Sequence, residues 1–311
     1  MPAIATDNLT KKFGDLTAVD SLTLSVAQGE LFGLVGSDGA GKTTTMRMLT
    51  AIMEPSAGQA LVMGLHTSRE AEAVKEKIGY MSQRFGLYPD LTVLENIHFY
   101  ADIFGLPRRE RQKRVEELLG FSNLTPFSRR RAGNLSGGMK QKLGLACALV
   151  HTPRVLFLDE PTNGVDPVSR RDFWRILYRL LAEGVTIFVS TAYLDEADRC
   201  NRVGLIHKGK LLACDTPGGL KKLMRGTILE VRTEAPRSAA RLLTKRLKDA
   251  SVGLFGDKVH VVTADAEATT AAVEALCREQ GMALAGIRVI EPNLEDVFVS
   301  MLATQSPGAA E

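Results

Sequence analysis

The 311-residue sequence contains no uninterrupted apolar run of the ~18 residues that a membrane-spanning helix needs. Residues 1–8 also lack the basic-then-apolar pattern of a secretory signal segment. The sequence therefore predicts a protein that does not span a membrane and that stays in the cytoplasm.

Cysteine and histidine are scarce. The four cysteines show no C-x-x-C spacing, so reduced and mostly buried thiols are expected. The five histidines are scattered, which excludes a clustered metal site built on them. The net charge of +3 fits a cytoplasmic membrane face and does not require a nucleic-acid partner. The length suggests about two domains, and the 45% hydrophobic content allows a sizeable core.

A glycine-rich loop stands between a strand-like run, residues 30–35, and a helix-like run, residues 44–49. Its sequence is G-x-x-x-x-G-K-T, and its glycines allow backbone N–H groups to surround a polyphosphate. Lys42 can reach the β- and γ-phosphates, and the Thr43 hydroxyl can hold Mg²⁺. The alternative is a glycine-rich turn that happens to end in Gly-Lys-Thr. The expected phosphate-binding residues are Gly36, Ser37, Asp38, Gly39, Ala40, Gly41, Lys42, Thr43 and Thr44.

Asp38 is unusual within this loop because it places a carboxylate beside a phosphate site. A cap or turn of the loop is the structural alternative for this residue.

A second chemical feature is a pair of acids, Asp159 and Glu160, after the buried-strand pattern of residues 155–158. Asp159 is placed to hold Mg²⁺, directly or through water. Glu160 can accept a proton from an attacking water. Adjacent acids in a loop are usually only solvated, but their position after a central strand favours the functional interpretation.

Three further features are ambiguous when taken alone. Phe13 can stack on a nucleotide base or belong to the core. Gln83 ends a predicted strand, residues 78–82, and can reach Mg²⁺ or water or simply be solvated. Ser136 begins a helix whose first residues, Gly137 and Gly138, leave the amides uncovered. That helix is either ordinarily capped or a second phosphate-binding N-terminus.

Residues 215–219 are the best candidate for a linker. The predicted elements after it follow the order βαββαβ, which is the ferredoxin-like pattern. A last helix, residues 294–302, is expected to be capped by Asn293, and the tail after residue 304 is expected to be disordered. The predicted division is 1–220, 221–304 as an accessory or dimerisation domain, and a tail 305–311.

In this order the motifs resemble those of an ATP-binding-cassette (ABC) ATPase over about residues 4–220. The matches are residues 36–43 to Walker A, Gln83 to the Q-loop, 135–141 to the LSGGxxQ signature, 155–159 to Walker B, Glu160 to the catalytic glutamate and 163–166 to the D-loop. Phe13 stands where the family has its base-stacking aromatic residue. The resemblance implies an α/β P-loop NTPase cassette with a RecA-like core, an antiparallel β subdomain and a helical signature subdomain. The ferredoxin-like α+β domain would follow it.

The resemblance also implies site roles. Lys42, Gln83 and Glu160 would be catalytic, and Thr43, Gln83 and Asp159 would hold the metal. Phe13, the Walker A residues and the signature residues Ser136, Gly137 and Gly138 would bind ATP. Two cassettes would clamp two ATPs, each between one chain's Walker motifs and the other chain's signature.

The run 291–298 is similar to the tail of daunorubicin-resistance-type export ATPases, in the branch of bacterial multidrug exporters with separate permease subunits. This resemblance implies ATP and Mg²⁺ as cofactors and membrane permeases plus a second cassette as partners. It implies a peripheral location on the cytoplasmic face of the inner membrane and no nucleic acid. Residues 83–89 resemble the region that receives a permease's coupling helix.

One residue departs from the family pattern. The family has a switch histidine where this chain has Ala192, in the run Ser190-Thr191-Ala192-Tyr193, and alanine cannot donate a hydrogen bond to a γ-phosphate. One alternative is therefore a degenerate cassette that binds ATP and lends its signature to an active partner. Another is a soluble ABC protein of DNA repair or translation. The single cassette, with no long coiled-coil insertion or strongly basic patch, argues against this last alternative.

Overall fold

The computed structural model describes residues 1–83, 86–224 and 226–305. Residues 84–85, within the expected coupling segment, and 306–311, within the expected tail, lie outside the described residues. The chain forms two compact units, Met1–Pro217 and Gly218–Glu311. In the part of the chain that is described, no helix has the length and apolar character required to cross a membrane.

The first unit is built on a six-stranded sheet. Its order is β10 (Lys210–Asp215), β9 (Arg202–His207), β3 (Leu31–Val35), β8 (Thr186–Thr191), β7 (Val155–Asp159) and β6 (Ile78–Met81). Five neighbouring strands, β9 to β6, run parallel, and only β10 is antiparallel. Every residue of β3, β7 and β8 is buried, as expected for central parallel strands covered on both faces.

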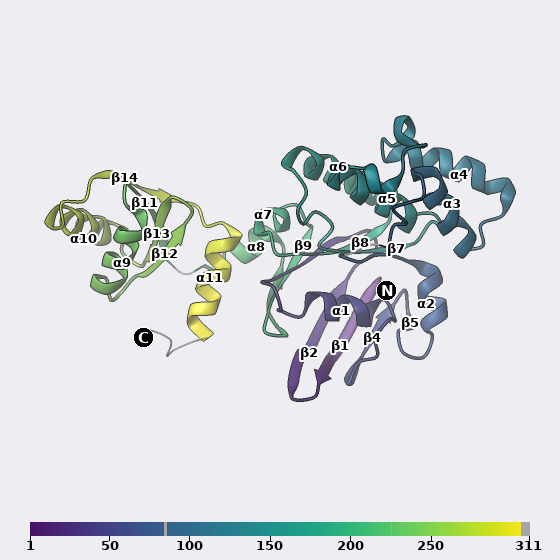
Figure 1. Cartoon of the computed structure of the whole chain (residues 1–311). Helices are drawn as coiled ribbons and strands as arrows, with labels where there is room; N and C mark the ends of the chain where they lie inside the picture. Colours follow the sequence, from purple (N-terminus) through teal and green to yellow (C-terminus); the bar gives the residue numbers. More distant parts are fainter. Residues whose placement is uncertain (84–85, 225, 306–311) are drawn as a thin grey trace. The chain divides into compact units, whose positions relative to one another are not determined.

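Phenylalanines of neighbouring central strands pack side by side. Phe32 and Phe157 both lie opposite Phe188 in the parallel pairing, with ring centroids 5.2 and 5.7 Å away. They belong to a core that includes Met46 of α1 (Lys42–Leu49). Helix α1 contacts strands of both sheets of this unit and lies between them in Figure 1. The phosphate-loop helix is thus held by packing on two sides.

A second sheet is antiparallel, with the order β2 (Leu16–Val26), β1 (Ile4–Phe13), β4 (Ala57–Val62) and β5 (Leu65–His66). Buried and exposed residues alternate in the second half of β2, residues 22–26, so this part of the strand has one buried face. Ala57 and Gly58 begin β4. Gly58 has φ +74°, and a Cβ there would lie 2.2 Å from the carbonyl oxygen of Asn8, so this irregular pairing needs glycine.

Helices form the rest of the first unit. They are α2 (Ala71–Lys77), α3 (Val93–Ile103), α4 (Arg108–Phe121), α5 (Gly137–Ala148), α6 (Pro167–Ala182) and α7 (Leu194–Ala197), with 3₁₀ turns η1 (Thr125–Phe127) and η2 (Ala132–Asn134). Thr92 and Glu95 form a capping box that fixes the start of α3. Helix α5 packs between α3 and α6.

The second unit has the predicted βαββαβ order. Its elements are β11 (Thr227–Thr233), α9 (Pro236–Arg246), β12 (Ser251–Phe255), β13 (Lys258–Thr263), α10 (Ala266–Glu279) and β14 (Leu284–Ile290). The antiparallel sheet order β12-β13-β11-β14 is the ferredoxin-like one. Asn293 caps α11 (Leu294–Gln305), as predicted, by accepting a hydrogen bond from the Asp296 amide.

The segment expected as a linker, residues 215–219, contains the boundary between the two compact units, and its residues other than Thr216 belong to regular elements. Asp215 ends β10, and Pro217 begins α8 (Pro217–Lys221), because proline suits the first turn of a helix. Leu220 in this helix is fully buried. The cysteines are free thiols, and Cys147, Cys200 and Cys277 are buried while Cys214 is half-buried.

Candidate functional site

The predicted residues meet at the carboxyl edge of the six-stranded sheet. Since β6, β7, β8 and β3 are parallel, the segments that follow them emerge at one edge. Gln83 follows β6, Glu160 follows β7, Ala192 follows β8 and the loop from Gly36 follows β3. Strand order thus brings together four segments that are far apart in the sequence.

The phosphate loop depends on its glycines. Gly41 has φ +105°, and a Cβ at this residue would lie 2.4 Å from the carbonyl oxygen of Ala18. A Cβ at Gly36 would lie 2.2 Å from the carbonyl oxygen of Ile206. Only glycine fits both positions, and the loop leads directly into the N-terminus of α1, a favourable place for an anion.

Lys42 is buried at the base of this loop, with 4% of its side chain exposed. Its ammonium group donates to the carbonyl oxygens of Gly36 and Ser37 at 2.8 and 3.0 Å. It also lies 3.1 Å from Oε1 of Glu160, whose side chain is 10% exposed. The lysine charge is therefore fixed between the loop and the expected catalytic carboxylate.

Asp159 lies below the cavity and is oriented by two hydroxyl groups. The Ser190 and Thr43 hydroxyls donate to its Oδ1 at 2.6 and 3.2 Å. Its Oδ2 is buried and has no hydrogen-bond partner among the described residues. A buried anionic oxygen beside a threonine hydroxyl is an oxygen donor set that suits Mg²⁺, so these residues fit the expected cation.

Glu160 has a strained backbone, with φ +48° at a residue other than glycine. Its amide donates to the carbonyl and hydroxyl oxygens of Ser190, both at 3.1 Å. Its side-chain Oε2 accepts hydrogen bonds from Gln83 at 3.0 Å and from Asn163 at 3.3 Å. These contacts hold both the backbone and the carboxylate of Glu160.

A cavity of about 430 Å³ lies above these groups. It is lined by Phe13, Leu16, Ala18, Asp38, Gly39, Gly41, Lys42, Thr43, Thr44, Gln83, Glu160 and Asn163. Phe13 is 46% exposed and forms no part of the core, so its ring is accessible at the cavity. Gly36, Ser37 and Ala40 belong to the loop without lining the cavity.

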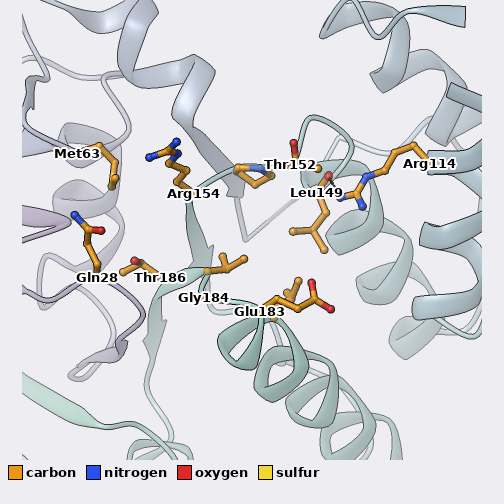
Figure 2. Close-up of a pocket in the computed structure, with 12 residues that line it drawn as sticks. Gln28, Met63, Arg114, Leu149, Thr152, Arg154, Glu183, Gly184 and Thr186 are labelled. Atoms are coloured by element: carbon orange, nitrogen blue, oxygen red, sulfur yellow. Dashed lines mark hydrogen bonds between the residues drawn. The ribbon is translucent and has the colours of Figure 1, made fainter. Parts of the chain in front are cut away.

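Figure 2 shows a different cavity, which also measures about 430 Å³. Gln28 and Arg154 in its lining precede β3 and β7, and Thr186 begins β8. It therefore lies at the amino edge of the sheet, and none of the predicted site residues lines it.

The three predicted signature residues do not line the cavity of their own chain that lies beside the phosphate loop. The Ser136 hydroxyl accepts a hydrogen bond from the Met139 amide at 3.3 Å and caps α5. A Cβ at Gly138 would lie 2.4 Å from the Ser169 side chain on α6, so glycine allows these helices to pack closely. A Cβ at Gly137 would lie 3.9 Å from the carbonyl oxygen of Gly164 in the D-loop.

A smaller cavity of about 240 Å³ lies beside Ala192 and is also lined by Asp38, Glu160, Asn163, Thr191 and Tyr193. Sequence reasoning placed Asn163 in the D-loop match and Ser190 in the run that holds Ala192, but it gave neither residue a contact with Asp159 or Glu160. The signal for Ser190 was a hydroxyl residue at the carboxyl end of a central strand. The signal for Asn163 was an amide residue three positions after Glu160.

The fold and motifs agree with comparisons to known proteins. The family model described as "ABC transporter" matches residues 19–163. The "Probable multidrug ABC transporter ATP-binding protein YbhF" of Escherichia coli (strain K12) is 42% identical over 303 residues, which are 96% of this chain and 52% of that protein. The chain thus spans about half the length of this relative. The "Daunorubicin resistance ATP-binding protein DrrA2" of Streptomyces coeruleorubidus is 34% identical, with 96% of this chain and 94% of that protein covered.

Solved structures give the same result over 68% and 71% of this chain. The "Structure of ATP binding subunit of ABC transporter" has a TM-score of 0.65 and 27% identity, covering 71% of this chain and 92% of that one. The ATP-binding cassette MJ0796, in a dimeric post-hydrolysis state bound to ADP and Pi, has a TM-score of 0.63 and 26% identity, covering 68% and 98%. The fold is therefore the α/β ABC cassette expected from the sequence, and the chain belongs to the ABC transporter family as one of its ATP-binding proteins.

Proposed function

We propose that this chain is the ATP-binding and ATP-hydrolysing subunit of an exporter whose permease subunits are separate membrane proteins. The observation that carries the proposal is the convergence of Lys42, Asp159 and Glu160 at one edge of the sheet, beside a phosphate loop. The names of the multidrug and daunorubicin-resistance relatives support export as the process.

In the proposed reaction the phosphate loop and Lys42 bind the triphosphate, and Phe13 stacks on the base. Glu160 accepts a proton from the attacking water, with its carboxylate held by Gln83. Thr43, Asp159 and Gln83 are the residues that would hold Mg²⁺. When bound, Mg²⁺ would neutralise charge on the phosphates.

We also propose that two cassettes close on two ATPs, with Ser136, Gly137 and Gly138 contacting the ATP held by the partner. Their position outside their own cavity supports this role. The chain would act at the cytoplasmic face of the inner membrane, where the region 83–89 would meet a permease.

Lys42→Ala tests the phosphate site. The substitution is expected to weaken Mg-ATP binding about tenfold or more, because a charge-assisted phosphate contact contributes roughly 1.5–3 kcal/mol. Calorimetric titration measures the effect. Lys210→Ala is the control, since Lys210 is an exposed lysine that pairs with Asp20 at 3.4 Å. Unchanged affinity in a folded Lys42→Ala protein would contradict the site assignment.

We propose a domain division near residue 220, with the second unit as an accessory or dimerisation domain. A chain truncated after Lys221, the end of α8, is expected to bind ATP with unchanged affinity and to associate less well with its twin or the permease. Calorimetry and sedimentation of the full-length and truncated proteins measure the two effects. A folded truncation that no longer bound ATP would refute this division of roles.

A further inference from the structure

We propose that Asn163 is a positioning residue that holds the Glu160 carboxylate toward the cavity, and that the Tyr193 hydroxyl holds Asn163. The inference rests on the proposed function, because it concerns the carboxylate that would accept the proton. Asn163 and Tyr193 both line the cavity beside Ala192. The side chain of Ala192 is only a methyl group.

The geometry assigns a direction to each contact. Glu160 Oε2 accepts from Asn163 Nδ2 at 3.3 Å, and Tyr193 Oη donates to Asn163 Oδ1 at 3.4 Å. An ionised carboxylate can only accept, so the amide must present its nitrogen to Glu160 and its oxygen to the phenol. Asn163 thus links the Tyr193 hydroxyl to the Glu160 carboxylate through two hydrogen bonds. These separations are long, as is common before a substrate tightens a site.

Tyr193 is itself restrained. Its backbone amide donates to the Thr191 hydroxyl at 3.0 Å, and the Arg170 guanidinium lies 4.6 Å from its ring centroid. A cation over an aromatic face is attractive and holds the ring orientation. The Tyr193 hydroxyl is therefore held in place, and its hydrogen bond restrains the Asn163 amide.

The two loops that carry Asn163 and Tyr193 are fastened to one buried carboxylate, Glu196. It accepts hydrogen bonds from the hydroxyls of Thr162 and, at 2.8 Å, of Thr191, and it lies 3.5 Å from the Arg170 guanidinium. A buried charge is stable only when paired in this way, so movement of either loop would break several bonds at once. This arrangement fixes the distance between Asn163 and Tyr193.

Steady-state hydrolysis by the full chain tests the inference. Asn163→Ala is expected to lower kcat about five- to tenfold with ATP affinity changed less than twofold, because the residue acts on the carboxylate and not on binding. Tyr193→Phe, which keeps the ring under Arg170, is expected to lower kcat about two- to threefold. In a Glu160→Gln background, Asn163→Ala is expected to have no further effect, since a residue that acts only through Glu160 has nothing left to position.

Two matched controls are available. Gln112→Ala removes an amide that donates to the Glu116 carboxylate at 2.8 Å on α4. Tyr178→Phe removes a hydroxyl that donates to the Arg199 carbonyl at 3.3 Å, from a ring that is 40% exposed against 37% for Tyr193. Both are expected to keep the wild-type kcat.

The outcomes separate this inference from the proposed function. If Glu160→Gln lowers kcat as expected but Asn163→Ala leaves kcat unchanged, this inference is overturned and the proposed function stands. An Asn163→Ala effect of the same size in the Glu160→Gln background would also overturn it. An unchanged rate in Glu160→Gln would instead remove the proposed role of Glu160 as the base, on which this inference rests. If Asn163→Ala unfolds, Tyr193→Phe carries the same comparison.

Discussion

Replacement of Glu160 by glutamine is expected to lower kcat for ATP by about a hundredfold or more, because a general base contributes roughly 10²–10⁴-fold. Affinity for ATP should be kept, because glutamine retains the shape of the side chain. The substitution removes the ion pair with Lys42, 3.1 Å away, so the Lys42 charge stays free to contact phosphate. Phosphate release in steady state and calorimetric titration measure the two quantities. An ATP-bound pair of cassettes should then persist, so Mg-ATP should increase the dimer fraction in light scattering.

Glu30→Gln is the matched control for this variant. Glu30 is also buried and ion-paired, 3.3 Å from Arg202, but it precedes β3 at the amino edge of the sheet. It should keep the wild-type kcat. A Glu160→Gln protein that lost ATP binding, or that hydrolysed ATP at the wild-type rate, would show that the base is another group.

Replacement of Ala192 by histidine is expected to raise kcat about ten- to a hundredfold. The family resemblance implies that a histidine at this position would donate a charge-assisted hydrogen bond of roughly 1.5–3 kcal/mol to the γ-phosphate, and this range gives the expected gain if the bond acts mainly in the transition state. The cavity of about 240 Å³ beside Ala192 has room for the imidazole ring. We therefore expect slow hydrolysis by the isolated wild-type chain, measured as phosphate release at saturating Mg-ATP. Ala192→Phe, which fills the space without a donor, should give no gain.

A slow site has a consequence for assembly. A chain without the histidine can work beside a different cassette that has one, and the competent site would then use the partner's Walker motifs and this chain's signature. In that complex Ser136→Ala should impair hydrolysis more than Glu160→Gln does. A fast isolated wild-type enzyme that gains nothing from Ala192→His would remove the reason to expect such a partner.

Much of the fold was predictable because the central strands and the phosphate-loop helix carry local signals. Residues 155–158 are apolar on both faces, and the Gly-Lys-Thr of the loop opens a helix. The βαββαβ order of the second unit was predictable because each element has its own period. Strand β1 was missed, since Asn8 has φ +48° and the pairing shifts register there, which breaks the alternation of apolar residues.

The candidate site was only partly predictable, because its geometry depends on strand order. The sequence names Asp159 and Glu160 but not the Ser190 hydroxyl that binds them, since β8 becomes the neighbour of β7 only in the folded sheet. The same holds for Asn163 and Tyr193, which meet across two loops. Asn163 stands in the run matched to the D-loop and Tyr193 in the run that holds Ala192, but neither match says that the two side chains meet.

The most direct test of the central proposal is an assay of phosphate release. The full-length chain carries a tag, and the complex that co-purifies with it from detergent-solubilised membranes is assayed. The account predicts Mg-ATP hydrolysis by a complex that contains an integral membrane protein. It also predicts a large loss of that hydrolysis when the chain carries both Lys42→Ala and Ser136→Ala, because each ATP site of the complex uses either the Walker motifs or the signature of this chain. Hydrolysis that persists at the wild-type rate in the doubly substituted complex, or a chain that comes out of the membranes alone, would contradict it.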